Sequence, residues 1–432
     1  MMGGMASEET RTTGTTKSPP IRSSAGTDPE TETAATRAWA TRLVIAGIVL
    51  SALNLRPAIT SLGALLEEVR DGLGMSGSVA GLLTSVPPFC FALFGVMAPR
   101  LARRFGPGAV VCAGMVAITA GLAIRPYVGS TAGFLAASAL ALMGIAVSNV
   151  LMPVIVKRWF PDRVGSMTGL YSMALALGTS AAAAVTVPMT GALGGSWQSG
   201  LAVWAGLAAV AVVPWIFLVR ERGPAAAEGA PAREEPPALR ITRSRTAWAL
   251  AVFFGLQATA AYITMGWMAQ IFRDAGVPAS TAGLLLAVTM VMGVPLAFVI
   301  PRLAARLPHQ GPIVVALGVS GLAGYAGLYL APAGGAWAWA VLLGVANCSF
   351  PLALTMVGMR ARSGAGVAQL SAFAQSTGYL ISIPGPLLVG VLYQHSGGWG
   401  LPIALMAALM VPQIVVGVLA GRNRTVEDEA AR

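Results

Sequence analysis

The sequence predicts an all-α polytopic membrane protein with twelve transmembrane helices in two pseudo-symmetric six-helix bundles. Three observations predict this fold: a composition poor in charge, twelve long apolar segments, and a repeat that relates the two halves of the chain. Of the 432 residues, 56% are hydrophobic and 10% are charged, with a mean hydropathy of +0.72. A soluble protein carries about 25% charged residues. The surface of this protein is therefore expected to face lipid.

Each apolar segment is long enough to cross a hydrocarbon core of about 30 Å. The widest polar gap, 220–246, is predicted to link a bundle at 37–219 to a second bundle at 247–421. A disordered cytoplasmic tail is predicted at 1–36, which is polar with almost no large hydrophobic residue, and a cytoplasmic C-terminal tail is predicted at 422–432. The twelve segments lie near 42–66, 78–98, 108–126, 132–156, 165–190, 198–219, 247–271, 280–300, 311–331, 336–358, 366–392 and 399–420.

The positive charges predict the orientation in the membrane. If the N-terminus is inside, 24 of the 28 Lys and Arg residues fall in inner segments, and only Arg70, Arg125 and Arg273 fall outside. By the positive-inside rule, both termini are expected in the cytoplasm of a multi-pass plasma-membrane protein. The net charge of +11 is then an orientation signal, and nucleic acid is not expected as a partner.

The two halves repeat at an offset of 202 residues. Segment 76–104 aligns with 278–306 without a gap, giving 11 identities in 29 positions. Pro99-Arg100-Leu101-Ala102 aligns with Pro301-Arg302-Leu303-Ala304, and Arg104 aligns with Arg306. Two six-span halves in parallel repeat are the plan of the major facilitator superfamily. The paired cations Arg100, Arg104, Arg302 and Arg306 are predicted gating residues.

Several motifs resemble the cyanate and 2-nitroimidazole transporter family of that superfamily, over about residues 40–422. They are Asn54-Leu55-Arg56-Pro57, the segment 157–165 (KRWFPDRVG), the segment 350–355 (FPLALT) and the segment 374–380 (AQSTGYL). The resemblance implies a secondary transporter that works by alternating access. One departure is Arg103, which stands where the superfamily usually places an acidic residue. The usual charge relay between the halves is therefore expected to be altered or absent.

Arg56 is the sharpest functional signal. It lies 14 residues beyond Arg42, or about 21 Å along a helix, where a charge costs at least ~2.5–3.5 kcal/mol unless it faces protein or water. No Asp or Glu is expected at that depth to neutralise it. Pro57 removes a helical hydrogen bond to Leu53, so the helix is expected to kink or open. Arg56 is thus predicted to anchor a substrate anion or nitro group; alternatively, it binds backbone carbonyls and holds span one against a neighbour.

Other polar residues in the predicted spans are further candidates for substrate binding. Thr60 lies one turn beyond Arg56 on the same face, whereas Asn54 faces elsewhere and is expected to bond a neighbouring span. Gln375 and Tyr379 share a helix face at i, i+4. Any of these side chains could instead bridge two spans. The remaining candidates are Tyr171, Asn149 and Gln257.

The sequence offers almost nothing for an enzyme or a metal centre. Its three cysteines lie in apolar segments without metal-ligand spacing, and its two histidines lie near segment ends. No catalytic residue, metal or cofactor is therefore predicted, and the partners are the lipid bilayer and a small substrate, anionic or nitro-bearing. The expected function is transport of a small anion or polar nitrogenous compound (cyanate-like) by a monomer. The alternatives are efflux of nitroimidazole-like drugs and, in another class, a membrane receptor or scaffold.

Overall fold

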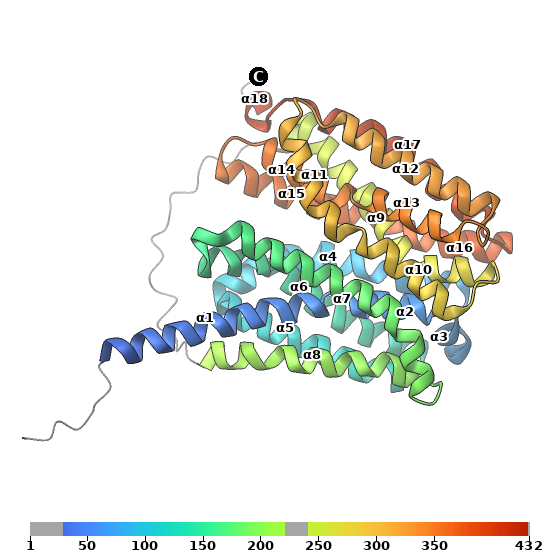
Figure 1. Cartoon of the computed structure of the whole chain (residues 1–432), viewed down its shortest axis with the longest axis horizontal. Helices are drawn as coiled ribbons and strands as arrows, with labels where there is room; N and C mark the ends of the chain where they lie inside the picture. Colours follow the sequence, from blue (N-terminus) through green and yellow to red (C-terminus); the bar gives the residue numbers. More distant parts are fainter. Residues whose placement is uncertain (1–28, 221–240, 431–432) are drawn as a thin grey trace, which may run out of the picture. The chain divides into compact units, whose positions relative to one another are not determined.

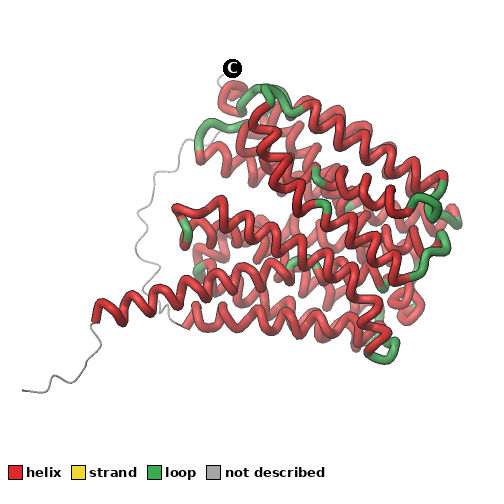
Figure 2. Tube along the Cα trace, in the orientation of Figure 1, coloured by secondary structure: helices red, strands yellow, loops and turns green. Residues whose placement is uncertain are grey.

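The computed structural model describes residues 29–220 and 241–430. Within these ranges all regular structure is helical (Figure 2). Twelve helical segments are long and apolar enough to cross a membrane, which confirms the predicted number of spans. Residues 42–432 form one unit, and the contacts described below all lie within it. The predicted linker 220–246 and N-terminal tail 1–36 fall mostly outside the described residues, although helix α1 already begins at Pro29.

The first six spans are drawn in blue to green in Figure 1. Span one consists of α1 and α2, which the short helix α3 follows, and spans two to six are single helices. The bounds are α1 Pro29–Asn54, α2 Pro57–Ala64, α3 Leu66–Leu73, α4 Gly77–Phe105, α5 Pro107–Ile124, η1 Arg125–Tyr127, α6 Thr131–Trp159, η2 Pro161–Arg163, α7 Val164–Ala192 and α8 Trp197–Arg220.

The last six spans are drawn in yellow-green to red (Figure 1). Spans seven, nine and twelve are the single helices α9, α12 and α17, while spans eight, ten and eleven are each a pair of helices. The bounds are η4 Ile241–Arg243, α9 Arg245–Asp274, α10 Ala279–Val291, α11 Gly293–Arg306, α12 Gly311–Leu330, α13 Ala336–Asn347, α14 Ser349–Met359, α15 Gly364–Ser382, α16 Pro384–Ser396, α17 Gly400–Ala420 and α18 Val426–Ala430.

Four spans are broken near their middle. Span one breaks at Leu55 and Arg56, directly before Pro57, so the expected opening of this helix is confirmed. The other breaks fall at Met292, Cys348 and Ile383, each within three residues of a proline. Proline removes a backbone donor and crowds the preceding turn. Broken backbone at membrane depth is tolerated only where protein or a cavity covers it.

The two ends of the bundle differ in charge. One end, here called the basic end, carries the exposed Arg100, Arg104, Arg302 and Arg306. The opposite end, here called the latch end, carries α3 and the connection from α9 to α10 (Figure 1). Near the latch end the two halves approach closely: a Cβ atom on Gly390 in α16 would lie 2.7 Å from the Cα atom of Gly81 in α4.

At the basic end, the short helix α18 ties the chain back to two spans, inside the segment 422–432 that the sequence predicts as a tail. Glu429 accepts hydrogen bonds from the Ser244 hydroxyl at 2.6 Å and from the backbone N–H and hydroxyl of Thr246 at 3.1 and 2.8 Å. Glu427 accepts from the backbone N–H groups of Arg362 and Ser363 at 3.0 and 3.2 Å. These two carboxylates therefore attach α18 to the starts of α9 and α15.

We expect this attachment to weaken in acid. Burial raises the pKa of Glu429, but the hydrogen bonds from Ser244 and Thr246 outweigh it, so the pKa lies below its ordinary value. Such a carboxylate stabilises the folded state above its unfolded pKa, and the stabilisation is lost as the pH falls through the folded pKa. The protection of the α18 amides, which is their exchange rate corrected for the pH dependence of intrinsic exchange, should therefore fall as the pH drops below 4.5, the ordinary pKa of a glutamate. In Glu429→Gln, low protection should already be present at pH 7; unchanged protection in this variant would contradict the role of Glu429.

Candidate functional site

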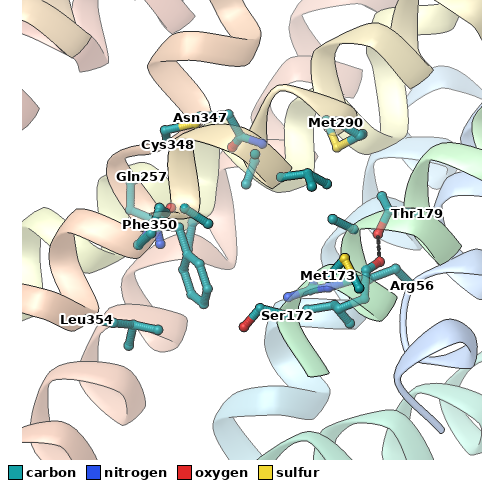
Figure 3. Close-up of a pocket in the computed structure, with 18 of the residues that line it drawn as sticks. Arg56, Ser172, Met173, Thr179, Gln257, Met290, Asn347, Cys348, Phe350 and Leu354 are labelled. Atoms are coloured by element: carbon teal, nitrogen blue, oxygen red, sulfur yellow. Dashed lines mark hydrogen bonds between the residues drawn. The ribbon is translucent and has the colours of Figure 1, made fainter. Parts of the chain in front are cut away.

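A cavity of about 440 Å³ lies between the two halves at the level of the helix breaks. Its walls come from the first residue before α2 and from α7, α9, α10, α11, α13, α14 and α15. The cavity extends toward the basic end. Its lining there includes Thr168, Pro301 and Thr355, each of which lies within five residues of the end of its helix on that side. Figure 3 shows Arg56 on one wall and Gln257, Asn347 and Phe350 on the opposite one.

Arg56 reaches this cavity because span one is interrupted. Its carbonyl accepts hydrogen bonds from the backbone N–H groups of Ile59 and Thr60 at 3.0 and 3.1 Å. Arg56 is therefore the N-cap residue of α2, directly before the first helical residue Pro57. The side chain is half-buried and lines the cavity. Its Cζ atom lies 5.8 Å from the centre of the Phe91 ring in α4. This contact supports the guanidinium on one side and leaves its donors available to the cavity.

Arg56 has no carboxylate partner in the part of the chain that the structure describes. The ionisable groups that interact with it are three tyrosines, Tyr262, Tyr379 and Tyr171. The ion pairs of the described residues involve Arg273 and Arg362 instead. The expectation of an unneutralised cation at this depth therefore agrees with the structure.

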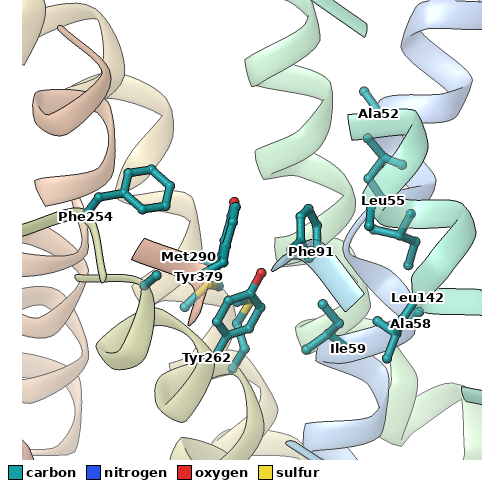
Figure 4. Packing of buried hydrophobic residues seen from close by; sticks show 14 of the residues in the cluster. Ala52, Leu55, Ala58, Ile59, Phe91, Leu142, Phe254, Tyr262, Met290 and Tyr379 are labelled. Atoms are coloured by element: carbon teal, nitrogen blue, oxygen red, sulfur yellow. The ribbon is translucent and has the colours of Figure 1, made fainter. Parts of the chain in front are cut away.

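Aromatic rings form the wall beside Arg56 (Figure 4). Tyr379 lies at the centre of this wall. The centre of its ring lies 5.0 Å from that of Phe91, 5.2 Å from that of Phe254 and 6.4 Å from that of Tyr262. Phe254 in turn contacts Phe350, which faces the cavity, at 5.9 Å. These rings come from spans two, seven, ten and eleven, so the wall forms only when both halves are assembled.

Few polar groups other than Arg56 are available to a ligand. Gln257 is 3% exposed, and its Oε1 atom has no hydrogen-bond partner among the described residues. Thr179 and Thr355 also line the cavity, but their hydroxyls donate to the carbonyls of Leu175 and Pro351 within their own helices. A ligand is thus offered a cation, the amides of Gln257 and Asn347, a few hydroxyls and mostly apolar walls.

The structure brings three of the predicted substrate-binding residues, Arg56, Gln257 and Tyr379, to the cavity. Tyr171 donates to the side-chain oxygen of Asn149, so these two side chains join span five to span four beside the cavity. Neither residue lines the cavity, but Tyr171 interacts electrostatically with the guanidinium of Arg56, which does.

Three other predicted residues make contacts outside the cavity lining. The Thr60 hydroxyl donates to the Arg56 carbonyl at 3.3 Å and is fully buried. Asn54 donates to Leu207 in α8 at 3.3 Å, the kind of bond to a neighbouring span that the sequence suggests. Gln375 donates to Ser371 on its own helix at 2.8 Å.

Sequence reasoning missed the apolar part of the lining. Met173, Met265, Met290, Phe298 and Phe350 all face the cavity. In a span that is apolar on every side, hydrophobic periodicity does not separate cavity-facing from lipid-facing residues. Pro295 and Pro351 were a usable signal for this lining, because the helix breaks at Met292 and Cys348 lie three residues before them.

A set of contacts here called the latch joins the halves at the latch end. Arg273 at the end of α9 pairs with Glu67 at 2.8 Å and with Glu68 at 2.9 and 3.0 Å in α3. Gln270 contacts Glu67 at 3.4 Å. Nearby, the Gln394 side chain accepts from the Ser78 hydroxyl at 2.7 Å, which joins α16 to the start of α4.

Comparison with known proteins identifies the family to which this fold belongs. The profile of the Major Facilitator Superfamily matches residues 44–362. The chain belongs to the major facilitator superfamily. An uncharacterized transporter of Bacillus subtilis (strain 168), YycB, is 34% identical over 88% of this chain and 94% of its own length. A crystal structure of the nucleoside transporter NupG shares the fold, with a TM-score of 0.72 at 14% identity over 88% of this chain and 99% of its own.

Two relatives from Escherichia coli (strain K12) have named substrates. The 2-nitroimidazole transporter is 31% identical over 89% of this chain and 96% of its own length. The cyanate transport protein CynX is 29% identical over 85% and 94%. The resemblance that the motifs indicate is therefore confirmed, and this superfamily member is a multi-pass transporter of a small molecule.

The central position of Tyr379 leads to a prediction about packing. Tyr379→Phe should change the free energy of unfolding by less than about 1 kcal/mol, because the ring contacts remain. Tyr379→Ala should cost roughly 3–5 kcal/mol, because three rings lose their neighbour. Thermal unfolding in detergent measures both. Equal destabilisation by the two variants would mean that the hydroxyl, and not the ring, holds this wall together.

Proposed function

We propose that this protein moves a small anion or polar nitrogenous compound across the plasma membrane by alternating access, with Arg56 as the substrate anchor. One observation carries the proposal: a guanidinium without a carboxylate partner among the described residues lines the central cavity at a helix break. Guanidinium presents several donors in one plane and binds planar, electron-rich groups through two parallel hydrogen bonds.

The chemistry of the relatives' substrates agrees with this site. Cyanate is a small anion, and the nitro group of 2-nitroimidazole is planar with two acceptor oxygens, so both can accept from Arg56. Gln257 adds an amide, while the aromatic wall around Tyr379 accommodates a flat apolar body. No Asp, Glu or His is among the described lining residues. We therefore propose that a proton on the substrate, anion exchange at Arg56, or no coupling at all accompanies transport.

The positions of the latch and the cavity support alternating access. The positive-inside rule puts the basic end, both termini and the mouth of the cavity in the cytoplasm. The latch then closes the extracellular side, where Glu67 and Glu68 in the first half hold Arg273 in the second. For transport, these ion pairs must open while the halves rock about the site. We propose a monomer as the transporting unit, because the cavity lies between the two halves of a single chain.

The anchor is tested by ligand-induced thermal stabilisation of the purified protein. The panel contains cyanate, nitrate, bicarbonate, short carboxylates and 2-nitroimidazole. We expect one class to stabilise the wild type and Arg56→Ala to weaken its binding by roughly ten- to a hundredfold, because a charge-assisted hydrogen-bond pair is lost. Arg56→Lys should retain part of the affinity, since lysine keeps the positive charge but lacks the planar guanidinium that donates two parallel hydrogen bonds.

Arg424→Gln is the matched control, because this arginine is exposed at the basic end, away from the cavity. It should respond to ligands as the wild type does. If Arg56→Ala also responds as the wild type does, Arg56 is a structural residue, and the anchor proposal is wrong.

The latch is tested with a reporter cysteine. In a cysteine-free background, Leu62→Cys lies near the latch end and is 7% exposed in the latched state. Breaking the partly exposed Arg273 pairs by Arg273→Gln removes about 1 kcal/mol, so maleimide labelling of the reporter should accelerate roughly fivefold. Arg362→Gln, which breaks an exposed ion pair to Asp428 at the basic end, should leave the rate unchanged. Equal rates in all three proteins would remove the latch from the transport cycle.

A further inference from the structure

A second guanidinium, that of Arg125, is buried in the first half of the protein. Arg125 begins η1 at the end of α5 and is 2% exposed. Its Nη1 atom donates to the Ala58 carbonyl in α2 at 2.9 Å, and its Cζ atom lies 5.9 Å from the centre of the Phe134 ring. Its Nε and Nη2 atoms are buried and have no hydrogen-bond partner among the described residues.

Arg125 lines a small void of about 10 Å³ between α2, α4, α6 and α9. Ser138 also lines this void, and its buried hydroxyl has no partner in the described chain. Tyr262 lines the void as well, but its hydroxyl interacts with Arg56 in the central cavity. Thr84 also lines it and is already bonded, since its hydroxyl donates to the Gly81 carbonyl and accepts from the Trp267 ring N–H. The free polar groups around the void are thus the two guanidinium donors of Arg125 and the Ser138 hydroxyl.

The void is separate from the central cavity. Tyr262 lines both, whereas Arg56 lines only the cavity and Arg125 lines only the void. Arg125 lies at the end of α5 next to the latch end, and Leu62 and Gly63, which also line the void, lie at the end of α2 on the same side. The void therefore lies between the cavity and the latch end, with Tyr262 as the shared wall.

Size and charge indicate what this void binds. About 10 Å³ holds one particle the size of a water molecule or a small ion and excludes an organic substrate. A buried guanidinium without an opposite charge costs several kcal/mol. A water molecule would satisfy its donors but leave the charge uncompensated, whereas an anion does both.

We propose that Arg125 and Ser138 form a binding site for a single halide-sized monovalent anion, distinct from the substrate cavity. The anion neutralises Arg125 and accepts hydrogen bonds from its Nε and Nη2 atoms and from the Ser138 hydroxyl. It thereby joins the end of α5 to α6. This inference does not depend on the proposed function, because no substrate contact enters it.

Bromide is the probe, since its anomalous X-ray scattering locates it directly. Crystals of the full-length wild-type protein grown in sodium bromide should show an anomalous peak beside Nε and Nη2 of Arg125. A peak only at Arg56, or ordinary water density beside Arg125, would overturn the proposal. This measurement requires no variant, so it remains decisive even if changes at Arg125 prevent folding.

Thermal unfolding in solution gives the second readout. At constant ionic strength, replacing gluconate by bromide should stabilise the wild type and the exposed control Arg424→Gln to the same extent. Arg125→Gln should weaken bromide binding roughly ten- to a hundredfold, and Ser138→Ala should weaken it several-fold, because each removes hydrogen-bond donors to the anion. Undiminished stabilisation in Arg125→Gln would contradict a site at Arg125.

Discussion

Placing a cation inside the hydrocarbon layer is the constraint on which the rest of this structure depends. Arg56 avoids lipid only because span one opens at Pro57 and turns the side chain into a cavity between the halves. The opened backbone is acceptable in turn because protein surrounds it: Asn54 bonds to α8, and Arg125 holds the Ala58 carbonyl. The break, the charge and the cavity are therefore mutually dependent.

The cavity walls combine a single strong polar anchor with adaptable apolar surface. Phe350 and the tyrosine rings give flat contact area, whereas Met173, Met265 and Met290 are flexible and adjust to differently shaped ligands. With Arg56 as the proposed anchor, such a site would select for the group that Arg56 binds more than for the shape attached to it. The same proposal would accommodate the different molecules named for two relatives, cyanate and 2-nitroimidazole.

Opposite charges are distributed unequally along the membrane normal. At the latch end, Glu67 and Glu68 meet Arg273 across the interface of the two halves, and the pairing holds that end shut. At the basic end, Arg100 and Arg302 are exposed and occupy matching positions in the two halves, and the positive-inside rule predicts that such an end faces the cytoplasm. Two acidic residues of this end, Glu427 and Glu429, attach α18 to the second half.

The sequence by itself determined the twelve spans, the duplicated halves, the break at Pro57 and the isolation of Arg56, because the cost of exposing charge or unbonded backbone to lipid is local and readable residue by residue. It did not determine which sides of the spans meet. Gln257 and Tyr379 reach the cavity while Gln375 bonds within its own helix, although all three look alike in an apolar segment. The pairing of Arg273 with Glu68 and the burial of Arg125 also appear only in the fold. These contacts join residues up to about 200 positions apart, and only the packing of one half against the other brings them together.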